Sequence, residues 1–68
     1  MQKYFVNKNS QANWDHEVHT SYCTHLPTEE NRKYLGMFES CRQAVQEAKK
    51  IYPSADGCAY CCPLCHTR

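Results

Sequence analysis

Four of the six cysteines lie in one C-terminal segment, CAYCCPLCH, which covers residues 58–66. Two C-x2-C pairs follow one another in this segment, Cys58 with Cys61 and Cys62 with Cys65. A C-x2-C loop can place two sulfurs about 3.5–4 Å apart, which suits one edge of a zinc tetrahedron with Zn–S bonds of about 2.3 Å. The segment therefore predicts half of a metal site.

The two consecutive pairs differ in the residues that shape their turns. Gly57 precedes Cys58 and lets the backbone turn toward a metal without a Cβ clash, whereas Pro63 stiffens the later loop. This favours Cys58 and Cys61 as ligands. Cys62 and Cys65 remain alternates: they are spare thiols, a disulfide partner for Cys41, or the true second pair.

A second pair of candidate ligands, His19-x3-Cys23, lies in the middle of the chain. Zinc bound by His19, Cys23, Cys58 and Cys61 would fasten the C-terminal end to this middle region. Four protein ligands leave no open position for water, so the predicted zinc is structural. The site has ordinary alternatives too, because His19 also fits a plain strand residue, and His16 and His25 are expected to face solvent or cap a turn.

The chain has 68 residues, which predicts a single domain with a thin core over residues 1–68. A core of this size usually needs a staple, either a metal or disulfides. The N-terminal residues MQKYFVNKNS show no signal-peptide pattern, and no stretch is long and apolar enough to span a membrane. We therefore expect a cytoplasmic protein with reduced, metal-binding thiols; the alternative is a secreted domain stapled by three disulfides.

The rest of the sequence predicts an α+β domain in which a short antiparallel sheet packs against one helix. Strands are expected at residues 4–6 and 33–38, with Gly36 marking a bulge, and residues 17–22 form either a short strand or the approach to a zinc knuckle. Trp14, in the polar loop of residues 9–15, is expected to plug the core.

The helix is predicted over about residues 41–51. Ser40 and Gln43 form a capping box, and Pro53 stops the helix. An apolar stripe at helical spacing faces the core. It consists of Cys41, Ala44, Val45, Ala48 and either Ile51 or Tyr52. Cys41 on this stripe is expected to be a buried core thiol.

One tempting motif is rejected. Cys62 to His66 satisfies C-x-x-C-H, the haem attachment pattern, and His66 adds another possible metal donor. No helix follows that would enclose a haem, and no export signal accompanies the motif, so haem attachment is not predicted.

The order of these features resembles the small zinc-binding domain of Ada-type alkylation-repair proteins and their stand-alone, uncharacterised bacterial relatives. The resemblance implies an N-terminal strand, a capped helix and a closing C-x2-C pair around zinc. The longer helix and loop before that pair depart from the family pattern. The matching stretches are His19 to Cys23, Asn31-Arg32 with the strand after it, Ser40 to Ile51, and Cys58 to Cys61.

The repair chemistry of that family is not expected here. In the family, the first cysteine of the x3 pair accepts a methyl group from a DNA phosphotriester as a zinc thiolate. The matching residue is His19, and a zinc-bound imidazole is not that nucleophile. We carry over the zinc site and leave out the methyl transfer.

The sequence thus predicts a small non-enzymatic zinc-binding module that contacts nucleic acid or protein. The net charge of +1 gives no strongly basic footprint, so the partner stays open. The alternative is a thiol-based redox or alkyl-acceptor protein that uses the surplus cysteines Cys62 and Cys65. Candidate contact residues are Trp14, Tyr22 and Tyr60 with Arg32, Lys33 and Arg68.

Overall fold

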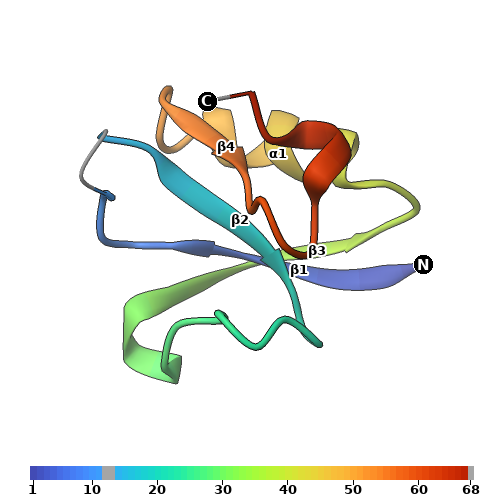
Figure 1. Ribbon diagram of the computed structural model, residues 1–68, viewed down its shortest axis with the longest axis horizontal. Helices are drawn as coiled ribbons and strands as arrows, with labels where there is room; N and C mark the ends of the chain where they lie inside the picture. The colour runs from blue at the N-terminus through green and yellow to red at the C-terminus, as the bar shows by residue number, and fades with distance from the viewer. Residues whose placement is uncertain (12–13, 68) are drawn as a thin grey trace.

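The structure, a computed structural model, describes residues 1–11 and 14–67. In these residues a four-stranded sheet packs against one α-helix, so the α+β class is confirmed (Figure 1). Two short 3-10 turns, η1 (Glu29–Asn31) and η2 (Pro63–Cys65), complete the fold. The strands are β1 (Gln2–Asn7), β2 (His16–Thr20), β3 (Arg32–Phe38) and β4 (Ala55–Gly57), and the helix is α1 (Cys41–Lys49).

The sheet is mixed, which differs from the wholly antiparallel sheet that was expected. The strand order is β3-β1-β2-β4, and β1 runs antiparallel to both of its neighbours. β4 pairs parallel with β2, in a register that sets Val18 opposite Gly57. The reason is topological: α1 carries the chain from the β3 edge to the opposite edge, and a helical crossover returns the chain in its original direction.

The core lies between α1 and one face of the sheet. Side chains alternate along β1, so Tyr4 and Val6 are buried in the core while Phe5 faces the opposite side. The helix contributes Ala44, Val45 and Ala48, as its apolar stripe predicted. α1 ends at Lys49, two residues before the predicted end, and Ile51 is 43 % exposed.

The bulge predicted at Gly36 is present. Tyr4 pairs with Gly36 and Phe5 pairs with Tyr34, so Leu35 is the extra residue on β3. Gly36 has φ +128°, a conformation that L side chains rarely adopt. The bulge turns Tyr34 to the same face as Phe5.

Two local predictions fail or hold only in part. Trp14 is 77 % exposed at φ 70° and does not plug the core. The predicted capping box is not seen in the described residues: Ser40 makes no side-chain cap bond, and Gln43 Oε1 accepts at 3.0 Å from the N–H of Glu39, the residue before the N-cap. No helix in the described part of the chain has the length and apolarity needed to cross a membrane.

Candidate metal centre

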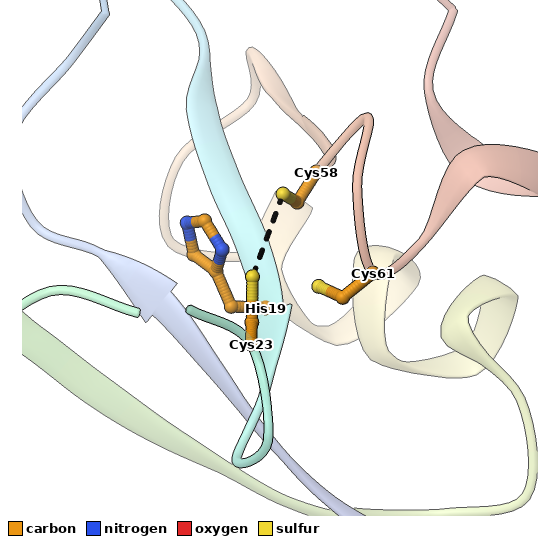
Figure 2. A group of neighbouring side chains, drawn as sticks. All are labelled: His19, Cys23, Cys58 and Cys61. Atoms are coloured by element: carbon orange, nitrogen blue, oxygen red, sulfur yellow. Dashed lines mark hydrogen bonds between the residues drawn. The ribbon is translucent and has the colours of Figure 1, made fainter. Parts of the chain in front are cut away.

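Four side chains from three separate parts of the chain converge beside the end of β2 (Figure 2). One potential ligand atom from each lies within 4.8 Å of every other. The Sγ atoms of Cys23 and Cys58, one from each ligand pair, are 3.8 Å apart. A tetrahedral zinc with Zn–S bonds of about 2.3 Å has an edge of about 3.8 Å. The cluster could therefore hold a metal ion, and its members are the four predicted residues, His19, Cys23, Cys58 and Cys61.

His19 enters the cluster from the sheet. It is paired with Phe5 across β1 and β2, which puts both residues on the face opposite α1. The side chain is 1 % exposed, and neither ring nitrogen has a hydrogen-bond partner in the described residues. Two unsatisfied nitrogens on a buried ring are unusual in a folded protein, and a metal ion would satisfy one of them.

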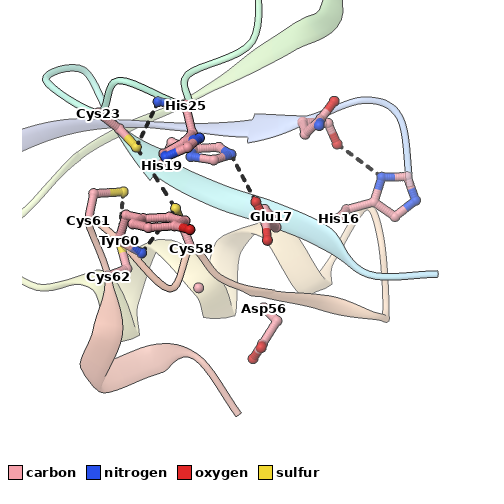
Figure 3. Close-up of polar contacts among 12 residues, drawn as sticks. His16, Glu17, His19, Cys23, His25, Asp56, Cys58, Tyr60, Cys61 and Cys62 are labelled. Carbon is pink, nitrogen blue, oxygen red and sulfur yellow. Dashed lines mark hydrogen bonds and ion pairs between the residues drawn. The ribbon is translucent and has the colours of Figure 1, made fainter. Parts of the chain in front are cut away.

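The two ring nitrogens of His19 have different surroundings. Nε2 lies 3.6 Å from Oε1 of Glu17, and one ring nitrogen is turned toward the sulfurs (Figures 2 and 3). A carboxylate behind a ligating imidazole is the usual arrangement in metal sites, because it orients the ring. Burial, with a smaller contribution from His25, lowers the pKa of His19 to about 4. The imidazole is thus neutral and able to coordinate at physiological pH.

Backbone N–H groups point at all three sulfurs of the cluster. Such bonds favour the thiolate, which is the form that binds metal. Burial raises the pKa of the Cys23 thiol, and the backbone hydrogen bond from His25 opposes that rise. The donors are the N–H groups of His25 to Cys23 at 3.3 Å, of Tyr60 to Cys58 at 3.4 Å, and of Thr20 to Cys61 at 3.3 Å.

Two of these N–H···S hydrogen bonds each span two residues, and the two turns that they close meet at the cluster. His25 and Tyr60 each lie two residues after a ligand candidate, Cys23 and Cys58, and each donates its N–H back to that sulfur. Their rings stack with centroids 4.1 Å apart at 24° (Figure 3). Tyr60 also lines a hollow together with Cys23 and Cys61, so the stack lies beside the cluster. The signal for this stack in the sequence is an aromatic ring two positions after Cys23 and two positions after Cys58, which the spacing of the ligands alone does not reveal.

The structure also separates Cys61 from its neighbour Cys62. Cys61 contributes to the cluster, whereas Cys62 is 2 % exposed and packs in the hydrophobic core. Their Sγ atoms are only 3.7 Å apart. Burial, followed by charge repulsion from Cys61, raises the pKa of Cys62 to about 12, so this thiol stays protonated. The alternate ligand Cys62 is therefore a core residue in this structure.

The other alternate, Cys65, forms a disulfide with Cys41. The expectation of a buried core thiol at Cys41 is wrong: both residues are half-buried, and Cys41 is the first residue of α1. The structure contains this one bridge, with the other four cysteines free, and not the three bridges of a disulfide scaffold.

Gly57 allows the C-terminal cysteine segment to approach the backbone of β4 closely. A Cβ built on it would lie 2.7 Å from Cβ of Cys65 and 2.9 Å from the carbonyl oxygen of Cys62. The expected relief of a Cβ clash is present, but Gly57 lies in β4 and not in a turn, and the crowding comes from the later cysteine segment. Gly57 therefore lets the C-terminal segment fold back on β4.

The remaining sequence candidates lie away from the cluster or beside it. His16 stacks on Tyr52 with ring centroids 3.9 Å apart, and its Nδ1 is 2.9 Å from the carbonyl oxygen of Asn7. His66 Nδ1 lies 3.1 Å from the carbonyl oxygen of Gly57. Neither histidine belongs to the cluster.

Comparison with family models, with curated proteins and with solved structures finds no match for this chain. The resemblance to Ada-type domains therefore stays a prediction from the sequence. The geometry of the cluster carries the functional argument alone.

Proposed function

We propose that the protein is a small non-enzymatic module whose fold is held by one structural zinc ion. The observation that carries the proposal is the convergence of one imidazole and three thiols within 4.8 Å. One nitrogen and three sulfur donors suit tetrahedral zinc, and four protein ligands leave no position for a reactive water. The ligands would be Nδ1 of His19 with the sulfurs of Cys23, Cys58 and Cys61.

Zinc would tie the turn after β2 to the segment after β4, in addition to the β2–β4 pairing and the Cys41–Cys65 disulfide. β4 has only three residues, and the buried core side chains that β4 and the following segment supply, Ala55 and Cys62, are small. Zinc binding in small domains contributes on the order of 10 kcal/mol, and it appears as folding free energy. The metal-free chain is then largely unfolded.

Native mass spectrometry with and without a strong chelator tests this proposal. We expect one zinc ion per chain, lost together with the compact charge-state distribution. A compact distribution that persists without metal would contradict a structural role. Cobalt substitution is the second readout, because thiolate-to-cobalt charge-transfer bands require sulfur ligands.

For the partner, we propose single-stranded nucleic acid bound on the sheet face opposite α1. Phe5 and Tyr34 lie together on this face with ring centroids 5.3 Å apart, and the Arg32 guanidinium lies 4.8 Å from the centre of the Phe5 ring. Tyr34 is 51 % exposed, and Lys3 shares the face through its pairing with Met37. Exposed rings beside cations on a sheet are a stacking platform for bases.

The other predicted contact residues do not belong to this platform. Tyr22 and Tyr60 are exposed near the metal centre, and Trp14 is exposed in the loop between β1 and β2. Lys33 pairs with Val6 and so belongs to the α1 side of β3. Arg68 lies outside the described residues.

Fluorescence anisotropy with a labelled single-stranded oligonucleotide tests the partner. We expect Tyr34→Ala and Arg32→Gln to weaken binding, and the affinity of the unmodified protein to fall with salt. Arg42→Gln on α1 is the matched control for charge and should bind normally. Absence of binding, or affinity that does not depend on salt, would contradict nucleic acid and direct attention to a protein partner.

A relationship to Ada-type domains is compatible with this proposal, but the proposal does not include the methyl transfer of that family. His19 occupies the position of the methyl-accepting cysteine. With imidazole at this position, the proposed zinc site has a structural role.

A further inference from the structure

The Cys41–Cys65 disulfide lies in the wall of a pocket that none of the four candidate metal ligands lines. This pocket has a volume of about 570 Å³ and is bounded by α1 on one side and the C-terminal segment on the other. Sites for small ligands typically measure about 300–1,000 Å³. Val45 and Leu64 add apolar walls, and Leu64 is 96 % exposed at the rim.

The pocket carries net positive charge. Arg42 and Lys49 line it and both are exposed. The one carboxylate in the lining, Asp56, is 5 % exposed and is already engaged. It accepts hydrogen bonds from the Thr67 N–H at 2.8 Å and from the Thr67 hydroxyl at 2.9 Å. An entering molecule therefore meets two cations beside a disulfide.

We propose that this pocket is a thiol–disulfide exchange site for low-molecular-weight thiols that carry carboxylates. The pocket is of a size for a short peptide thiol, and the cations would hold its carboxylates. The thiolate of the ligand attacks Sγ of Cys65 and forms a mixed disulfide, and the S–S bond breaks with Sγ of Cys41 leaving as a thiolate.

The place of Cys41 explains this direction of attack. Cys41 is the first residue of a nine-residue helix, where the helix dipole stabilises negative charge, and a more stable thiolate is the better leaving group. A second ligand thiolate then attacks the ligand sulfur of the mixed disulfide. This step releases Cys65 as a thiolate. Two ligand thiols are oxidised to their disulfide, and the protein disulfide is reduced to two thiols.

The fold tolerates the loss of this bridge because other contacts hold the C-terminal segment. Thr67 is bonded to Asp56, and His66 Nδ1 lies 3.1 Å from the Gly57 carbonyl oxygen. The thiol of Cys62 is buried in the hydrophobic core, 2 % exposed, and does not compete as a nucleophile. Exchange is thus confined to Cys41 and Cys65.

Reduction kinetics of the zinc-loaded, oxidised protein test the proposal, with glutathione as the anionic thiol and 2-mercaptoethanol as the neutral one. The two reductants are compared at the same thiolate concentration. The protein thiols that are released are alkylated and located by mass spectrometry. In the double variant Arg42→Gln/Lys49→Gln, the rate with glutathione should fall about fivefold, while the rate with 2-mercaptoethanol stays unchanged. Lys8→Gln/Lys33→Gln makes the same charge change at exposed residues that do not line the pocket and should leave both rates unchanged.

Two results would overturn the proposal. One is an equal effect of Arg42→Gln/Lys49→Gln on both thiols, which would show that the pocket does not recognise carboxylates. The other is alkylation of Cys23 or Cys58 along with Cys41 and Cys65, with loss of zinc, which would show that reduction follows unfolding.

In Cys41→Ser, treatment with oxidised glutathione should give a stable mixed disulfide at Cys65.

Discussion

The Sγ atoms of Cys23 and Cys58 lie 3.8 Å apart, although 35 positions separate the two residues in the chain. This distance equals the edge of a zinc–sulfur tetrahedron with bonds of about 2.3 Å. The parallel pairing of β4 with β2 brings it about, because it sets Gly57, the residue before Cys58, opposite Val18, the residue before His19. The His/Cys cluster is thus a product of the sheet register.

Removing one sulfur of this pair should abolish metal binding. In Cys23→Ser or Cys58→Ser, a hydroxyl replaces a thiolate, and we expect no bound zinc and loss of the far-UV circular dichroism of the fold. The matched control is Cys62→Ala, whose sulfur lies in the core. It should keep one zinc per chain and lose about 1–2 kcal/mol of stability. Retention of zinc in both serine variants would contradict the assigned ligands.

The number of protons released on zinc binding should report three thiols and one histidine. Near pH 7.5 we expect about three protons per chain, one from each thiol. Near pH 5.5 we expect about four, because His19 has an ordinary pKa of about 6.5 in the unfolded chain and a pKa of about 4 in the folded site. The stability from neutral His19 is therefore present above pH about 6.5 and is lost as the pH falls toward about 4.

Calorimetry in buffers of different ionisation enthalpy measures this proton release. His19→Cys is the control, since a fourth thiol should release about four protons at both pH values. A constant release from the unmodified protein across this range would exclude His19 as a ligand.

The stacked rings of His25 and Tyr60 should slow metal loss. Tyr60→Ala removes one ring of the stack beside the cluster, and we expect a chelator to extract zinc about fivefold faster, which corresponds to ~1 kcal/mol for the stacked pair. The stoichiometry should not change. Tyr34→Ala, at a tyrosine on β3 that is 51 % exposed, is the control and should leave the extraction rate unaltered. Equal acceleration in both variants would argue against a shielding role.

Gly57→Ala should destabilise the protein through steric crowding. The new Cβ would meet Cys65 Cβ at 2.7 Å and the Cys62 carbonyl oxygen at 2.9 Å, and backbone atoms cannot move away cheaply. We expect a loss of about 2 kcal/mol in urea unfolding of the zinc-loaded protein. Ala59→Ser, at an exposed position in the same loop, should change stability by less than about 0.5 kcal/mol. Similar stability of Gly57→Ala and the unmodified protein would contradict the close packing of the C-terminal segment against β4.

Local sequence patterns predicted a good part of this protein. The helical stripe of Ala44, Val45 and Ala48 and the glycine bulge at Gly36 each depend on neighbours within a few residues, so periodicity and turn chemistry were sufficient. The spacing of the two ligand pairs likewise nominated the four residues that the fold brings together. Trp14 was misjudged because composition predicts burial of a tryptophan and cannot show which way a loop turns it.

Tertiary structure was needed wherever the answer depends on contacts between distant segments. The parallel strand β4 follows from the path of α1 across the sheet, which no local pattern encodes. The roles of Cys61, Cys62 and Cys65 were open in the sequence because both C-x2-C pairs satisfy the same spacing. They are distinguished by the direction of each side chain: toward the cluster, toward the core, and toward Cys41 at the start of α1. Spacing limits which residues can meet, and the packing of β4 and the C-terminal segment against β2 and α1 selects among them.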